Sequence, residues 1–253
     1  NILLILVGGT ICTALNEEGN LSVSKEAGIL LKDNYLKSDS PFAESVNIDT
    51  TENLYVLSEN MTVNKWNEMI KTYRKYVTHK EYDGVILAHG TDTLAYSAAL
   101  FSMLLSSVKI PVFFVSANEN LKSARTNGNV NFRCAVECIC RKIAPNVYVP
   151  YKNLSDGRMY LHLASRLEQC KNYSEDFHST GEFDITDLTE DNYREYFLRL
   201  EKMYPRDKRK EVVDISGYLS DVIGEGFNIL SDILINGDTI SEFTKAIGNE
   251  IQS

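Results

Sequence analysis

The chain has 253 residues, of which 43% are hydrophobic and 24% are charged. A chain of this length and composition can bury a sizeable core, which excludes disordered, collagen-like and disulfide-scaffold proteins. The 26 Lys and Arg residues against 35 Asp and Glu residues give a net charge of −9 and a pI near 5.0. Because an acidic surface repels phosphates, we expect no nucleic-acid partner.

No stretch reaches the ~18 consecutive apolar residues that a membrane span needs, so we expect no membrane association. The five cysteines are an odd number in a large chain, which favours reduced thiols in the cytoplasm over a disulfide framework. Cys134, Cys138 and Cys140 have no histidine nearby in the sequence, so they favour a buried helix face over a metal site. We therefore expect neither a metal nor a cofactor.

Short apolar runs alternate with helical patterns through the first 150 residues. Residues 2–7 are continuously apolar, as in a parallel strand that is covered on both faces. Thr62 is the expected N-cap of the second helix. The predicted strands are 2–7, 54–57, 85–88, 111–115 and 147–151, and the predicted helices are 25–31, 62–75, 95–105 and 131–142. This order predicts an α/β fold with a mostly parallel sheet flanked by helices.

The composition changes after about residue 182, where a charged, helix-prone stretch begins. We expect an amino-terminal α/β domain over residues 1–180. A linker and a smaller or truncated carboxyl-terminal domain are expected over residues 181–253.

Two predicted strands end in small polar clusters, Gly8-Gly9-Thr10-Ile11 and His89-Gly90-Thr91-Asp92-Thr93. Glycines at a strand end allow the backbone to approach a ligand, and the threonines add hydroxyl groups there. In a parallel sheet, ligands bind at the carboxyl ends of strands near a reversal of strand order. Each cluster taken alone favours a simple turn, with Asp92 or Thr93 capping the next helix. The presence of both clusters favours a functional site.

The two clusters, in this order and about eighty residues apart, resemble the bacterial-type L-asparaginase family. The similarity continues through residues 57–62, 84–100 and 111–131 and ends near 165–166 and 176–177. It therefore covers most of residues 1–180, which correspond to the amino-terminal domain of such enzymes.

The resemblance implies hydrolysis of a side-chain amide, such as that of L-asparagine, to the acid and ammonia. Thr10 matches the nucleophile, while Thr91 and Asp92 match the first two members of a Thr–Asp–Lys relay. Ser58 and Glu59 match residues that hold the α-carboxylate and α-amino groups of the substrate, and the backbone of Gly90 and Ala117 is expected at the ligand. A threonine hydroxyl is a weak nucleophile, so it needs a nearby base and hydrogen-bond donors for the oxyanion. The family's sites lie between subunits, which implies a homo-oligomer, a dimer or a tetramer.

The chain departs from the family pattern at residues that handle protons. Gln169 stands at the candidate relay position, where a lysine is usual, and Asn20 replaces the usual loop tyrosine. Lys171 replaces the relay lysine only if the alignment shifts by two residues. Val115 and Asn127 stand where a threonine and an aspartate are usual. An amide has no useful pKa near neutrality, so the substitutions at 169 and 20 remove two proton carriers.

Three functions remain open from the sequence. The first is an asparaginase-type amidohydrolase with a threonine nucleophile, without metal or cofactor, acting on a small amino-acid amide. The second is a catalytically impaired homologue that binds a small amino acid or amide in a regulatory role, which Gln169 and Asn20 favour. The third is a nucleotide-binding α/β module, which depends only on Gly8 and Gly9, since no complete phosphate-binding motif is present.

Overall fold

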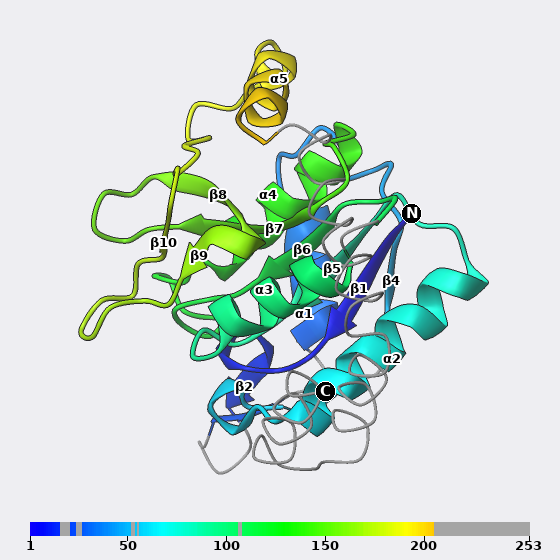
Figure 1. Cartoon of the computed structure of the whole chain (residues 1–253), viewed down its shortest axis with the longest axis vertical. Helices are drawn as coiled ribbons and strands as arrows, with labels where there is room; N and C mark the ends of the chain where they lie inside the picture. Colours follow the sequence, from blue (N-terminus) through cyan, green and yellow to red (C-terminus); the bar gives the residue numbers. More distant parts are fainter. Residues whose placement is uncertain (16–20, 24–26, 52–53, 55, 106–107, 205–253) are drawn as a thin grey trace, which may run out of the picture.

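The computed structural model describes residues 1–15, 21–23, 27–51, 54, 56–105 and 108–204. Its centre is a six-stranded sheet with the order β4-β1-β5-β6-β7-β8, in which only the edge strand β8 is antiparallel (Figure 1). The strands are β1 (Ile2–Leu6), β4 (Ile48–Thr50), β5 (Gly84–Ala88), β6 (Val112–Val115), β7 (Val147–Lys152) and β8 (Met159–Leu163). The predicted fold class, a mostly parallel sheet flanked by helices, is confirmed.

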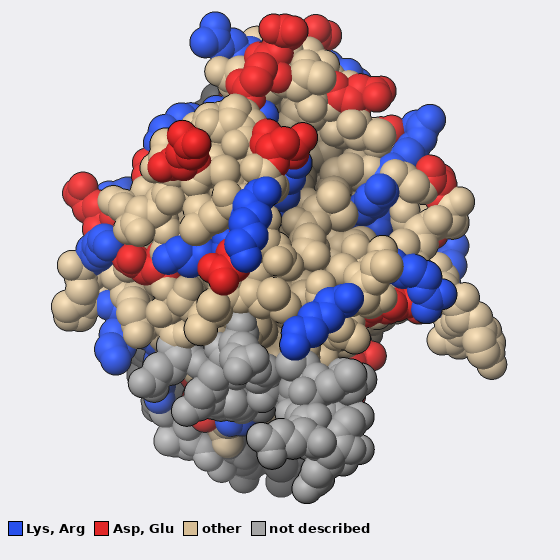
Figure 2. Space-filling model, turned by 180° about the vertical axis from the view of Figure 1, so that it is seen from behind, with Lys and Arg blue, Asp and Glu red and all other residues tan. Residues whose placement is uncertain are grey.

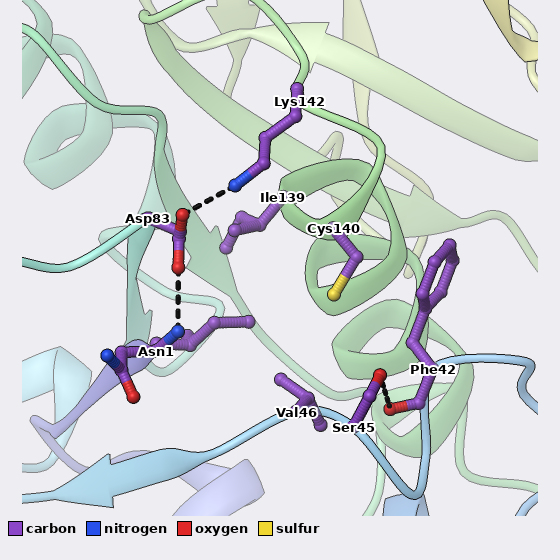
Figure 3. A pocket seen from close by; sticks show the side chains of 9 residues that line it. Asn1, Phe42, Ser45, Val46, Asp83, Ile139, Cys140 and Lys142 are labelled. Atoms are coloured by element: carbon purple, nitrogen blue, oxygen red, sulfur yellow. Dashed lines mark hydrogen bonds and ion pairs between the residues drawn. The ribbon is translucent and has the colours of Figure 1, made fainter.

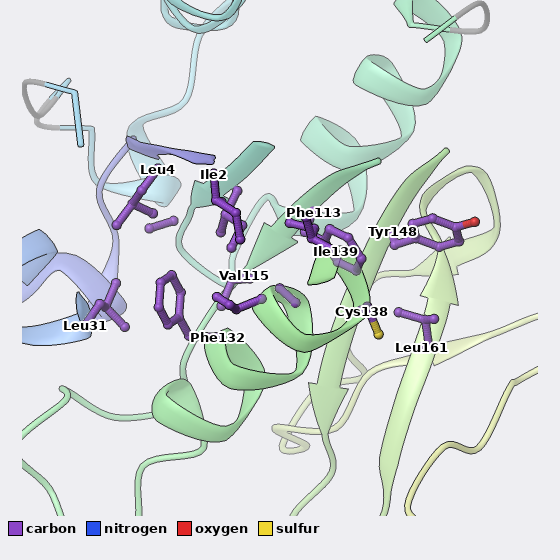
Figure 4. Close-up of a cluster of buried hydrophobic side chains, with 14 of the residues drawn as sticks. Ile2, Leu4, Leu31, Phe113, Val115, Phe132, Cys138, Ile139, Tyr148 and Leu161 are labelled. Carbon is purple, nitrogen blue, oxygen red and sulfur yellow. The ribbon is translucent and has the colours of Figure 1, made fainter. Parts of the chain in front are cut away.

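Helices cover both faces of the sheet, as right-handed crossovers between parallel strands require. Helices α1 (Ala27–Leu36) and α4 (Gly128–Cys140) contribute to one hydrophobic cluster, and α2 (Val63–His79) and α3 (Leu94–Leu104) contribute to the other. Figure 4 shows the first cluster, where side chains of α4 such as Phe132 pack on side chains of β6 and β7. The sheet is therefore buried on both sides, which explains why β1, β5 and β6 are apolar at every position.

Several predicted elements are found close to their expected bounds. Helix α2 begins after Thr62, whose hydroxyl accepts a hydrogen bond from the Lys65 amide at 3.4 Å as an N-cap does. Of the predicted strand at 54–57, the described residues show an isolated parallel bridge between Val56 and Gly8 and a hydrogen bond of 2.8 Å from the Leu54 amide to the Leu6 carbonyl. Ile48–Thr50 is the paired strand beside β1, and the sequence did not reveal it because three residues are too short for a periodic pattern.

The segment after residue 180 packs against the first hydrophobic cluster in its described part. Helix α5 (Tyr193–Met203) contributes Phe197 and Leu200 to this cluster, and Phe183 and Ile185 precede the helix there. Arg141 at the end of α4 pairs with Glu137 and with Glu190, which ties the approach to α5 to the sheet domain. The boundary at residue 180 stays a prediction.

The surface carries charges of both signs. Figure 2 shows Lys and Arg side chains interspersed with Asp and Glu side chains on the face that is turned away in Figure 1. All five cysteines are free thiols. In the described ranges, no helix combines the length and the apolar composition that crossing a bilayer requires.

Candidate functional site

The strand order reverses at β1. The next strand of the sheet along the chain, β4, lies on one side of β1, and β5 lies on its other side. A crevice for a ligand is expected at such a switch point, outside the carboxyl ends of the strands. Gly8 lies two residues after the end of β1 and Gly90 two residues after the end of β5, so both sequence clusters lie at this edge.

The two clusters meet through their backbones. Gly9 has a φ of 75°, and a Cβ atom on it would lie 2.1 Å from the Cα atom of Gly90. Gly8 has a φ of 142°, and a Cβ atom there would lie 2.0 Å from the carbonyl oxygen of Val56. Only glycine fits positions with such dihedral angles and such close neighbours. The glycines thus bring the segment after β1 into direct contact with Gly90 after β5 and with Val56.

Ser58 connects this third segment to the cluster after β5. Its side chain is buried, and its hydroxyl donates a hydrogen bond of 2.7 Å to the Oδ2 atom of Asp92. The hydroxyl of Thr93 in turn donates to the Ser58 carbonyl at 3.0 Å. Thr93 occupies the N-cap position of α3 without a capping hydrogen bond from its side chain, so the simple capping interpretation does not describe these residues.

The threonines and Glu59 lie around this contact. Thr10 begins the 3₁₀ turn Thr10–Cys12 and is half-buried, like Thr91, whose carbonyl accepts a hydrogen bond from the Leu94 amide at 3.2 Å. Asp92 and Glu59 are exposed. All four side chains are thus at least partly open to a solute, and their roles in catalysis and binding stay predictions.

Ala117 lies just beyond the end of β6 and is fully buried. A Cβ atom on Gly128, the first residue of α4, would lie 2.7 Å from the Cβ atom of Ala117. Asn131 of the same helix donates to the Ser116 carbonyl at 3.0 Å and accepts from the Lys152 amide at 2.8 Å. This bridging role was not predicted from the sequence, where an asparagine on the buried face of an amphipathic helix is its only signal.

Gln169 follows β9 (Leu167–Glu168), which packs against α3. Its Nε2 atom lies 3.6 Å from the Sγ atom of Cys170. Its Oε1 atom is buried and has no hydrogen-bond partner among the described residues. The candidate relay position therefore carries a neutral amide beside the helix that follows Thr91 and Asp92. Asn20 lies outside the described residues.

Two other reactive side chains near the site are held neutral. Burial lowers the pKa of His89 to about 4, against the opposing effect of its 2.7 Å hydrogen bond to the Gly90 carbonyl. The His89 ring packs edge-on against Phe114. Burial also raises the pKa of Cys12 to about 12, so its thiol is a poor nucleophile. Both residues thus fit structural roles better than chemical ones.

A separate hollow of about 200 Å³ opens at the amino ends of the strands (Figure 3). Asp83 lines it and pairs with the amino group of Asn1 and with Lys142. This hollow is remote from the carboxyl ends of β1 and β5, so it does not belong to the candidate site. The part of the chain that the structure describes holds no group of three or more metal-ligating side chains.

The fold is that of an α/β protein of the doubly wound class, in which the switch point beside β1 is the expected place for a ligand site. The chain belongs to the asparaginase family, because the profile described as "Asparaginase, N-terminal" matches residues 1–194. The predicted family is thereby confirmed.

Relatives at the sequence level include a glutamyl-tRNA(Gln) amidotransferase subunit from Archaeoglobus fulgidus, which is 29% identical over 64% of this chain and 37% of its own length. The corresponding protein of Methanothermobacter thermautotrophicus is 25% identical over 77% of this chain and 45% of its own length. The chain thus spans less than half the length of these two relatives.

Solved L-asparaginases share the fold. The thermostable L-asparaginase from Thermococcus kodakarensis superposes with a TM-score of 0.58 at 23% identity, over 73% of this chain and 52% of that chain. L-asparaginase I from Vibrio cholerae gives a TM-score of 0.58 at 21% identity, over 72% of this chain and 52% of that chain. At these identities the likeness concerns the fold alone.

Proposed function

We propose that this protein hydrolyses the side-chain amide of L-asparagine or of a related small amino acid to the acid and ammonia. The observation that carries the proposal is the backbone contact between Gly9 and Gly90. This contact holds the segments of Thr10 and Thr91 together at the switch point of the sheet. Membership of the asparaginase family supports the same reaction class.

In this proposal the hydroxyl of Thr10 attacks the amide carbon, the C–N bond breaks, and the protonated nitrogen leaves as ammonia, which gives an acyl-enzyme ester. Water then hydrolyses the ester to the acid and restores the Thr10 hydroxyl. Thr91 and Asp92 handle the protons of the reaction, and backbone N–H groups near Gly90 and Ala117 stabilise the oxyanion. Glu59 holds the α-amino group of the substrate and Asp92 shares the ammonium, while Ser58 serves the substrate site by orienting the Asp92 carboxylate. The exposure of Glu59 and Asp92 supports their part, because an exposed carboxylate is accessible to a cationic group of a ligand.

Gln169 favours a second candidate, a homologue that binds a small amino acid or amide without efficient turnover. An amide cannot relay a proton near neutral pH, whereas the lysine of the family pattern can. The buried Oε1 atom of Gln169 supports this candidate, since no lysine or arginine among the described residues hydrogen-bonds to it.

The first candidate function, amide hydrolysis, also fits the relatives that are named as subunits of an amidotransferase. An amidotransferase moves an amide nitrogen from a donor to an acceptor, and release of ammonia from an amide donor is one half of such a reaction. We propose the small amino-acid amide as the direct ligand of this chain in either setting. The homo-oligomer, the cytoplasmic location and the absence of a cofactor stay predictions.

Ammonia release from L-asparagine and L-glutamine tests the proposal. We expect release by the wild-type protein and its loss in Thr10→Ala and in Thr91→Ala. Calorimetry with L-aspartate separates the two candidates. Binding of aspartate without ammonia above the Thr91→Ala background would overturn hydrolysis and favour the binding protein.

A further inference from the structure

The loop between β6 and α4 is closed by two asparagines that bind each other's backbone. The amide N–H of Asn118 donates to the Oδ1 atom of Asn127 at 3.0 Å, and the amide N–H of Asn127 donates to the Oδ1 atom of Asn118 at 2.9 Å. The two residues are nine positions apart. This reciprocal pair joins the two ends of the loop without any strand pairing.

The nitrogen of the Asn127 side-chain carboxamide binds a third element, strand β7. Its Nδ2 atom donates to the carbonyl of Lys152, at the end of β7, at 2.8 Å. Asn127 is only 2% exposed. It occupies the N-cap position of α4, but its side chain makes no capping hydrogen bond there. Its carboxamide is therefore used at both ends, as an acceptor toward the loop and as a donor toward the sheet.

The loop itself is braced from inside. The hydroxyl of Thr126 donates to the Glu119 carbonyl at 2.8 Å, and the Glu119 carboxylate pairs with Arg125. These bonds make the loop one unit, and its hydrogen bonds to the end of β7 pass through Asn127 and the first turn of α4. When the side-chain carboxamide of Asn127 is removed, we expect the whole loop to move rather than a single side chain.

This unit begins directly after Ala117, whose backbone we place at the ligand in the proposed function. Ala117 is trapped between the end of β6 and Gly128, which leaves no room for a side chain on the glycine. The position of Ala117 therefore depends on how firmly the loop and the start of α4 are held to β7.

We infer that Asn127 is a positioning residue that fixes the wall of the site formed by Ala117 and the 118–127 loop. An aspartate, which the family pattern has at this position, cannot replace it in this chain. A carboxylate has no hydrogen to donate to the Lys152 carbonyl, and two acceptors would face each other in a buried place. This inference rests on the proposed function only where it assigns Ala117 to the ligand site.

The test compares Asn127→Asp with the wild-type protein and with Asn47→Asp. The control makes the same chemical change at an exposed asparagine beside the amino end of β4, far from the loop. Hydrogen exchange followed by mass spectrometry reports on loop opening without any need for activity. At pH 8 we expect peptides covering 117–127 to exchange about tenfold faster in Asn127→Asp and unchanged in Asn47→Asp.

Ligand binding and turnover give the second measurement. We expect the Kd for L-aspartate to rise about tenfold in Asn127→Asp. We also expect kcat/KM for L-asparagine to fall about tenfold, mostly through kcat, because the backbone near Ala117 is placed at the oxyanion. Lowering the pH toward 5 should reverse part of both effects, because burial raises the pKa of the new carboxyl and its protonated form donates to Lys152 again. Asn118→Ala removes the acceptor of the Asn127 amide N–H and a long hydrogen bond of 3.5 Å to the Arg125 carbonyl, both from a half-buried side chain, and should give the same pattern at smaller size.

The outcomes separate this inference from the proposed function. Unchanged exchange of 117–127 in both Asn127→Asp and Asn118→Ala would overturn the positioning role. Faster exchange with unchanged Kd and unchanged kcat/KM would overturn the link between the loop and the site. A wild-type protein without ammonia release would refute hydrolysis alone, because exchange and aspartate binding still test the role of Asn127.

Discussion

The hydroxyl of Ser58 donates a 2.7 Å hydrogen bond to the carboxylate of Asp92, across 34 positions of the chain. The Asp92 amide also lies 3.3 Å from the same hydroxyl oxygen, so the two residues are linked twice. Ser58 is buried, whereas Asp92 is exposed. The serine therefore orients a carboxylate that remains available to a ligand.

Replacing Ser58 with alanine should weaken ligand binding. Hydrogen bonds to charged groups contribute about 1.5–3 kcal/mol, and the exposure of Asp92 places this one at the low end, which corresponds to about tenfold in Kd. Calorimetry with L-aspartate measures the change. Ser45→Ala, at the amino end of the sheet, is the control, and equal Kd values for both variants would contradict the assignment of Ser58.

Replacing Gly9 with alanine should destabilise the fold strongly. The positive φ costs about 1–3 kcal/mol for a residue with a side chain, and the approach to Gly90 adds a backbone clash. We expect the free energy of unfolding to fall by about 3 kcal/mol or more, measured with urea.

Gly157→Ala is the matched control for this clash. Gly157 has a φ of 69°, but nothing lies within 4 Å of the position that a Cβ atom would take. Its cost should be the dihedral strain alone, about 1 kcal/mol. If both variants lose the same free energy of unfolding, the backbones of Gly9 and Gly90 are not close enough to exclude a Cβ atom on Gly9.

Two buried histidines should make the protein less stable in mild acid. Burial lowers the pKa of His89 to about 4 and that of His162 to about 3, below the ordinary value of 6.5. Below pH 6.5 the unfolded chain binds protons that the folded chain does not, so stability is full above this pH and falls as the pH drops toward 4. The slope is about 1.4 kcal/mol per pH unit for each histidine.

Urea unfolding at pH 7.5, 6 and 5 measures this slope. His89→Gln should reduce it by about half, whatever its effect on stability at pH 7.5. The pKa of carboxylates such as Asp83 is lowered from the ordinary value of 3.8, mainly by a hydrogen bond with Lys142. Their contribution to the free energy of unfolding is lost below that value, outside the pH range of this measurement, so it does not alter the slope. A slope that His89→Gln leaves unchanged would show that His89 is protonated in the folded protein.

Replacing Gln169 with lysine should raise the rate of ammonia release. A positioned proton carrier contributes about 10²–10⁴-fold to such reactions, and the imperfect geometry of a new side chain leaves an expected gain of about tenfold. Lys171→Gln tests the alternative alignment. If Lys171→Gln abolishes release and Gln169→Lys has no effect, then Lys171 is the relay residue.

The sequence alone was sufficient for the layers of the fold and for the two strand ends of the candidate site. Residues 2–7 are apolar without interruption because β1 is covered on both faces, and this signal lies entirely within the strand. The glycines after β1 and β5 are also a local signal, because a positive φ or a close backbone approach excludes other residues.

The edge strands were decided by pairing rather than by local pattern. Strand β8 is a run of five residues interrupted by His162, which is fully buried, and its pairing with β7 along five residues identifies it. Strand β4 is recognised only beside β1, since Asp49 and Thr50 give it no apolar run.

Only the tertiary structure showed that Ser58 binds Asp92 and that Asn118 and Asn127 bind each other. Hydrophobic periodicity and glycine placement reflect conditions at each residue, so they can be read from neighbours along the chain. A hydrogen bond between distant residues depends instead on how helices and strands pack, to within a few tenths of an ångström. The sequence by itself therefore indicated the edge of the sheet where the candidate site lies, and packing determined which side chains meet there.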